Sequence, residues 1–204
     1  MDSNHIFEIV DLLGVFVGAV TGALMGRRDR YDIMGLWFIA LFSGLGGGII
    51  RDVMINAGPP LALTEPAYLP TVAVATAAAA FLGRQIGRAE RTVLVLDAFA
   101  ISAFAVAGCL RALDFGLGVW ATLLLGVITA VGGGMLRDIM MGNTPTVFRQ
   151  SELYGLAALG VCIIVVVFRE MGSPRELTVP IGIAIGMFLR LGSLRWGWMS
   201  WEPR

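Results

Sequence analysis

The sequence predicts an all-α integral membrane protein of about seven transmembrane helices, and three observations support this fold class. The 204 residues are 57% hydrophobic and only 15% charged, whereas soluble domains are roughly 25% charged. Apolar runs recur along the whole chain. A pattern of glycines followed by charges occurs twice, at an offset of 86 residues. We expect residues 1–204 to form a single transmembrane domain.

Seven apolar runs are long enough, or nearly so, to cross a bilayer, which takes about 20 mostly apolar residues in a helix. We expect helices at residues 6–25, 33–55, 69–86, 93–110, 119–141, 154–168 and 179–194. Gly-Pro-Pro at residues 58–60 and Thr-Pro at residues 144–145 mark the two long connections, because glycine and proline favour turns.

The placement of arginines predicts the orientation, because cytoplasmic loops are enriched in positive residues. With the N-terminus outside, three arginines fall in outer connections and ten on the cytoplasmic side. The outer three are Arg111, Arg169 and Arg175, and the inner ten are Arg27, Arg28, Arg30, Arg84, Arg88, Arg91, Arg149, Arg190, Arg195 and Arg204. Trp196, Trp198 and Trp201 would then anchor the C-terminus at the cytoplasmic face.

The two copies of the repeated pattern are SGLGGGIIRD at residues 43–52 and TAVGGGMLRD at residues 129–138. The same offset aligns Asp11 with Asp97, Pro59 with Pro145 and Tyr68 with Tyr154 without a gap. This register indicates internal duplication, with repeat one at about 6–86, repeat two at about 92–172 and an extra helix at about 178–195. Each repeat holds three spans, so the second copy is inverted in the membrane, an arrangement typical of transport proteins.

The glycine triplets are expected to break the second and fifth helices. Glycine costs about 1 kcal/mol relative to alanine inside a helix, so three in a row disfavour it by roughly 3 kcal/mol. Backbone released in this way must face protein or water, where its carbonyls can replace part of a cation's hydration shell. The alternative is that the glycines only allow close helix packing. The six residues are Gly46, Gly47, Gly48, Gly132, Gly133 and Gly134.

Each triplet is followed by an arginine and an aspartate, Arg51-Asp52 and Arg137-Asp138. A charge at the bilayer centre costs on the order of 3 kcal/mol on insertion scales, so we expect these groups to line a cavity or to pair. We predict pairing between the repeats, with Arg51 bound to Asp138 and Arg137 bound to Asp52, along or at the gate of a polar path. Alternatively, each pair extends to its nearer membrane interface.

Asp11 and Asp97 are a further equivalent pair, placed in the outer part of the first span and the inner part of the fourth. They are candidates for attracting cations to the two mouths of a path. The competing interpretation is that each is a helix-end aspartate exposed to lipid headgroups.

Other classes of function are disfavoured. Basic and acidic residues balance at 15 each, so no dense basic patch predicts nucleic-acid binding. Cys109 and Cys162 lie in apolar runs without partner histidines, as buried small side chains do. His5 precedes the first span, and neither a serine-hydrolase elbow nor a zinc-binding histidine motif occurs. We expect no enzyme activity, no catalytic residue, no bound metal and no cofactor.

The elements GLGGGIIRDVM and AVGGGMLRDIMMGNTP, in a layout of three plus three plus one helices, resemble the prokaryotic branch of the trimeric intracellular cation channel family. Similar bacterial domains also carry a glycine transporter label. The resemblance covers nearly the whole chain. It implies a homotrimer in the bacterial or archaeal plasma (inner) membrane, with helices kinked at the triplets and a pore for monovalent cations, chiefly potassium, in each protomer.

The animal members of that family carry a Lys-Glu motif, linked to phosphoinositide binding, where this chain has Arg-Asp. Phosphoinositide binding is therefore doubtful here. The expected partners are membrane lipid and further copies of the chain.

Two functions follow from the sequence. The first is a passive channel that passes potassium or sodium ions through a water-filled path. The second is a secondary carrier of a small amino acid such as glycine, because inverted repeats and broken helices suit alternating access equally well. A purely structural protein would not need paired charges behind the glycine triplets.

Overall fold

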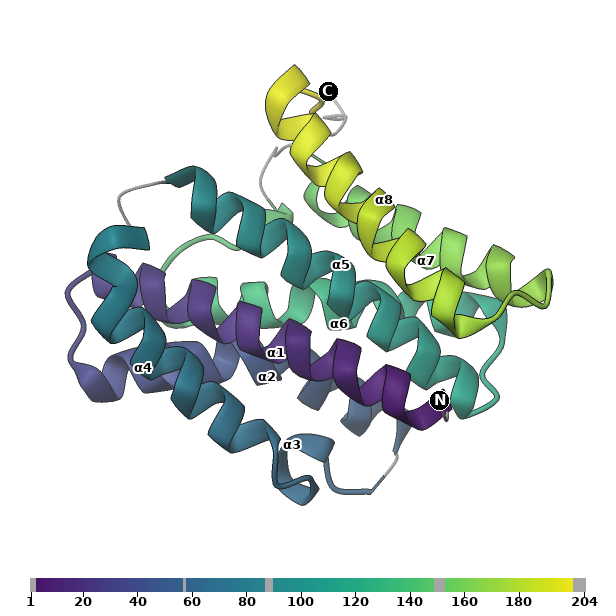
Figure 1. Ribbon diagram of the computed structural model, residues 1–204, viewed down its shortest axis with the longest axis horizontal. Coiled ribbons are helices and arrows are strands. Elements are labelled where there is room, and N and C mark those ends of the chain that lie inside the picture. The colour runs from purple at the N-terminus through teal and green to yellow at the C-terminus, as the bar shows by residue number, and fades with distance from the viewer. Residues whose placement is uncertain (1–2, 57, 87–89, 149–152, 200–204) are drawn as a thin grey trace.

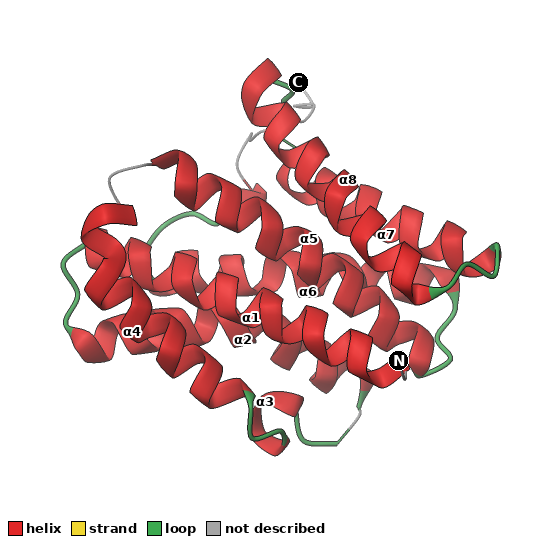
Figure 2. Cartoon of the chain, in the orientation of Figure 1, coloured by secondary structure: helices red, strands yellow, loops and turns green. Residues whose placement is uncertain are grey.

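The computed structural model describes residues 3–56, 58–86, 90–148 and 153–199, and over these ranges the chain forms helices and connections without any strand (Figures 1 and 2). Four residues on which the predicted orientation depends lie outside the described residues, namely Arg88, Arg149, Trp201 and Arg204.

Seven long helices and two short ones follow one another in the described residues. In order they are α1 (Ser3–Arg28), α2 (Ile33–Ile55), α3 (Leu61–Thr64), α4 (Tyr68–Ile86), α5 (Glu90–Asp114), α6 (Val119–Met140), the 3₁₀ turn η1 (Thr146–Phe148), α7 (Tyr154–Glu170) and α8 (Arg175–Trp196). The long helices match the seven predicted runs to within a few residues. The short elements α3 and η1 were not predicted.

Five of the described helices are long and apolar enough to cross a membrane, by length and composition. They are His5–Arg28, Ile33–Ile55, Arg91–Asp114, Val119–Met140 and Arg175–Trp196. A shorter apolar stretch, Tyr68–Phe81, lies in α4. The chain is therefore a multi-pass membrane protein.

Four helices form the centre of the molecule. α1 and α5 lie side by side and run in opposite directions, and α2 and α6 pack behind them (Figure 1). α4 packs on α1 and α2, while α7 packs on α5 and α6 in the corresponding way. α8 has no counterpart in this arrangement and covers α5 and α7.

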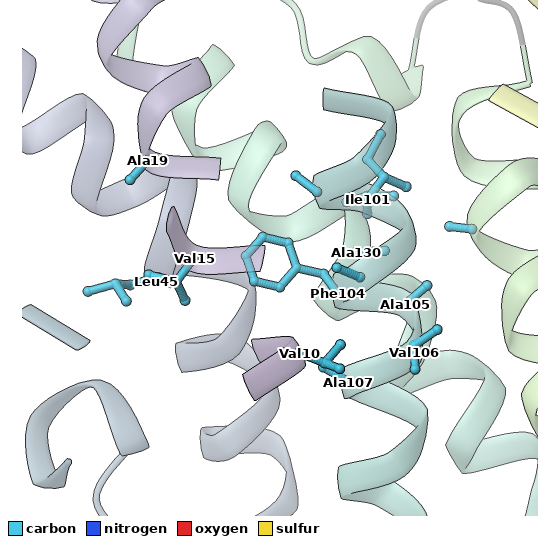
Figure 3. Close-up of a cluster of buried hydrophobic side chains, with 14 of the residues drawn as sticks. Val10, Val15, Ala19, Leu45, Ile101, Phe104, Ala105, Val106, Ala107 and Ala130 are labelled. Atoms are coloured by element: carbon cyan, nitrogen blue, oxygen red, sulfur yellow. The ribbon is translucent and has the colours of Figure 1, made fainter. Parts of the chain in front are cut away.

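Small side chains fill the core and allow the helices to approach closely, as is usual in membranes. Val10, Val15, Ala105 and Ala107 belong to this core (Figure 3). The four central helices contribute to it together with α4, α7 and α8. Cys109 and Cys162, which the sequence assigned to the interior, are fully buried free thiols.

The glycine triplets do not interrupt their helices, which corrects the expectation of a break. They form the point where α2 and α6 cross. A Cβ atom on Gly47 would lie 2.1 Å from the carbonyl oxygen of Thr129, and one on Gly133 would lie 2.3 Å from that of Ser43. Only glycine allows this backbone contact, and the packing offsets the modest helix penalty of about 1 kcal/mol per glycine. The packing alternative describes the structure.

Candidate functional site

A buried ion-pair group, here called cluster one, joins Asp11 of α1, Arg51 and Asp52 of α2, and Tyr68 of α4. Arg51 Nη1 lies 3.0 Å from Asp11 Oδ1, and Arg51 Nε lies 2.9 Å from Asp52 Oδ1. The Tyr68 hydroxyl donates a hydrogen bond to Asp11 Oδ2 at 2.7 Å. The three charged side chains are at most 2% exposed. One guanidinium thus holds two carboxylates in the protein interior.

The neighbouring elements satisfy the rest of cluster one. The backbone N–H of Leu61, the first residue of α3, donates to Asp52 Oδ2 at 2.9 Å. The ring of Phe7 lies 5.3 Å from the guanidinium carbon of Arg51, within the range of a cation–π contact. The short helix α3 therefore has a structural role, which is to supply a hydrogen-bond donor to the buried Asp52 carboxylate.

Cluster two repeats this arrangement with Asp97 of α5, Arg137 and Asp138 of α6, and Tyr154 of α7. Arg137 Nη1 lies 3.3 Å from Asp97 Oδ1, and Arg137 Nη2 lies 2.9 Å from Asp138 Oδ1. Thr146, the first residue of η1, donates its backbone N–H and its hydroxyl to Asp138 Oδ2, at 3.0 and 3.1 Å. The turn η1 thus supplies a backbone donor to Asp138, as α3 does to Asp52 in cluster one.

The two clusters differ in their surroundings. The Asp97 side chain is 17% exposed, whereas its counterpart Asp11 is 2% exposed. Arg190 of α8 lies over the ring of Tyr154, with its guanidinium carbon 5.0 Å from the ring centre. The helix outside the repeat therefore places a cation beside cluster two.

The predicted pairing between the repeats is wrong, because each arginine binds the aspartates of its own half. Contacts at the crossing join Gly47 to Thr129 and Gly133 to Ser43, so α2 and α6 run antiparallel. Their C-terminal ends, which carry the two arginine–aspartate pairs, consequently point in opposite directions.

The arginines of both clusters are buried and do not extend out of the protein. Arg51 and Arg137 are 1% and 5% exposed in their side chains, so the alternative of charges extending to the nearest headgroups does not hold. Asp11 is also buried rather than exposed at a helix end. The prediction that these charges pair inside the protein is met, although with different partners.

The two tyrosines, Thr146 and Arg190 were not placed in a functional site from the sequence. The repeat register aligned Tyr68 with Tyr154, and that equivalence was the signal that could have placed both beside the charges. Arg190 has no equivalent in the first half, so no internal comparison could have pointed to it.

Each cluster borders a small cavity with room for about one water molecule. Cavity one is lined by all four members of cluster one and by Gly48, and cavity two by three members of cluster two and by Gly134. The third glycine of each triplet therefore faces a cavity, whereas the second lies in the helix crossing. Among the described residues, no three histidine, cysteine or acidic side chains gather as a metal site would require.

Replacing Tyr68 by phenylalanine is expected to lower the free energy of unfolding by roughly 1.5–3 kcal/mol, because a buried carboxylate loses a charge-assisted donor. Denaturant unfolding in detergent measures this change. Tyr154→Phe is the matched control and should cost less, since in the described part of the chain the Tyr154 hydroxyl donates to neither aspartate of cluster two. Equal losses in the two variants would contradict the expected role of Tyr68.

Comparisons with known proteins agree with this architecture. A family model described as "Glycine transporter" matches the chain twice, over residues 8–85 and 94–170. The UPF0126 membrane protein SCO4104 of Streptomyces coelicolor is 40% identical over 195 residues, which are 95% of this chain and 89% of that protein. The UPF0126 inner membrane protein YadS of Escherichia coli K12 is 30% identical over 189 residues, 92% and 91% of the two chains.

A solved structure has the same fold. It is a trimeric intracellular cation channel orthologue from Rhodobacter sphaeroides, which superposes with a TM-score of 0.89 at 35% sequence identity. The match covers 94% of this chain and 98% of that one.

Proposed function

The chain belongs to the prokaryotic branch of the trimeric intracellular cation channel family, and we propose that it is a channel that conducts monovalent cations, potassium among them, through a pore in each protomer. Its structural relatives are ion channels and not enzymes. The observation that carries the proposal is the pair of buried arginine–aspartate clusters, each beside a cavity, on a fold shared with a cation channel.

The charge of the clusters suits a cation path. In each repeat one arginine faces two aspartates, so these three side chains carry more negative than positive formal charge. Arg190 offsets this excess at cluster two. Buried charge of this kind is costly in a membrane protein and marks ion pathways. Asp11 and Asp52 would receive a cation at one end of the path, and Asp97 and Asp138 at the other. Arg51 and Arg137 would hold these carboxylates in place.

The glycines of the two triplets have a role other than the predicted helix break. Gly46, Gly47, Gly132 and Gly133 bring α2 and α6 together at the crossing. Gly48 and Gly134 line the cavities. A Cβ atom on Gly48 would meet nothing closer than 3.6 Å, which leaves that position open, whereas one on Gly134 would lie 2.5 Å from the Tyr154 hydroxyl. The pore would pass beside this crossing rather than through a break in the helices.

The proposed oligomeric state and membrane location are those that the family resemblance implies. We propose a homotrimer in the plasma (inner) membrane, with the N-terminus outside, the C-terminus in the cytoplasm and lipid around it. The double match of the family model supports two repeats followed by an added helix. Antiparallel α1 and α5, and antiparallel α2 and α6, support an inverted relation between them. No cofactor is needed for passive conduction, and the permeating ions are potassium or sodium.

Conductance in a planar bilayer tests the proposal. Purified protein under a potassium gradient should give stepwise currents that reverse close to the equilibrium potential of potassium. Protein that passes no current, yet exchanges labelled glycine between the two sides of a liposome, would contradict a channel.

A secondary carrier of a small amino acid is the second candidate, favoured by the description of the matching family model. Asp52→Asn and Asp138→Asn separate the two functions. In a proton-coupled carrier these variants should lose pH-driven uptake and keep exchange, whereas in a channel they should change single-channel conductance or open probability. Labelled glycine uptake and single-channel recording on the same preparations give both measurements.

A further inference from the structure

Phe104 of α5 lies between the two cavities. Among the described residues, it is the one that lines both cavities, and it is 3% exposed. Its ring reaches from α5 towards Val15 of α1 and Leu45 of α2 (Figure 3). Phe104 therefore borders both the cavity beside cluster one and the cavity beside cluster two.

Two glycines of α1 make room for this ring. A Cβ atom on Gly14 would lie 2.9 Å from Cε1 of Phe104, and one on Gly18 would lie 3.2 Å from Cε2. Gly18 is also the residue that the offset of 86 aligns with Phe104. Residues 18 and 104, which are equivalent in the two halves, thus face one another. The ring of Phe104 fills the space that a side chain on Gly18 would need.

An apolar ring between two polar cavities is a barrier to an ion. The ring offers no oxygen to replace a hydration shell, and apolar constrictions in channels close by excluding water. We propose that the ring of Phe104 closes the path between the two cavities, and that its displacement joins them into one conducting route. This inference rests on the cation path proposed above, and it names the residue that limits conduction.

Potassium efflux from liposomes tests the barrier. Phe104→Leu and Phe104→Ala should raise the efflux per protein over that of the wild type, by roughly tenfold for alanine and less for leucine, since a smaller apolar side chain leaves space for water. Phe104→Trp should lower it. Phe99→Ala is the matched control, because Phe99 lies in the same helix and lines neither cavity, and it should leave efflux unchanged.

The variants separate the barrier from the channel itself. Wild-type efflux decides whether the protein conducts, while the ratio of variant to wild type decides whether Phe104 limits the flow. A silent wild type with a conducting Phe104→Leu variant would support the barrier, and equal efflux in the two would overturn it. Elution of each variant at the wild-type volume in size-exclusion chromatography shows that it is folded. If the Phe104→Ala variant does not fold, the efflux of Phe104→Leu relative to the wild type tests the barrier.

Discussion

Gly47→Ala is expected to lower the free energy of unfolding by about 3 kcal/mol, at the upper end of what overpacking usually costs. The added methyl group would lie 2.1 Å from the carbonyl oxygen of Thr129, and backbone cannot rotate away as a flexible side chain can. α2 and α6 must then separate along their whole contact. Thermal and denaturant unfolding in detergent, with yield of folded protein, measure the effect.

Gly48→Ala is the matched control in the same triplet. A Cβ atom there meets nothing closer than Arg51 Nη2 at 3.6 Å, an ordinary contact, and alanine favours a helix by about 1 kcal/mol over glycine. This variant should be as stable as the wild type or more so, with reduced conductance because the methyl group enters cavity one. If Gly47→Ala and Gly48→Ala destabilised the protein equally, the close packing of Gly47 against α6 would not be the cause of the loss.

Arg51→Met is expected to cost about 3–5 kcal/mol of unfolding free energy, because it leaves Asp11 and Asp52 buried without their cation. Arg137→Met should cost less, since Asp97 is 17% exposed and water can solvate part of its charge. The same unfolding measurement on both variants gives the comparison.

The triple variant Asp11→Asn, Arg51→Met, Asp52→Asn is the control for charge. It removes the buried carboxylates together with the arginine, and so should recover a large part of the lost stability. If Arg51→Met alone were within about 1 kcal/mol of the wild type, the range of ordinary substitutions, cluster one would not be an ion pair that the fold depends on.

The sequence was sufficient for the helices and the equivalences between the halves, because apolar length and a gapless register are properties of the chain itself. It was not sufficient for the pairing of charges. Arg51 and Asp52 point in different directions along α2, and only the length of the arginine side chain lets its Nε atom return to the neighbouring carboxylate. The register aligned Asp11 with Asp97, but which arginine each would meet depended on the crossing of α2 and α6.

The role of the glycine triplets likewise could not be predicted from the sequence. Helix propensity gave a penalty of about 1 kcal/mol for each residue and therefore predicted a break. The compensating contact at Gly47 comes from a helix far along the chain, and a local scale does not include it. The short helix α3 was also beyond sequence reasoning, since its position is fixed by the hydrogen bond from Leu61 to Asp52.

The contact between equivalent positions bears on the ancestry of the molecule. Under the proposed duplication, the ancestor was a pair of identical three-helix chains inserted in opposite orientations. Where a residue met its own copy, a mutation changed both sides at once, so two glycines could face each other but two phenylalanines could not. Duplication into two separately mutating copies removed this constraint, and a ring at residue 104 opposite a glycine at residue 18 then became possible.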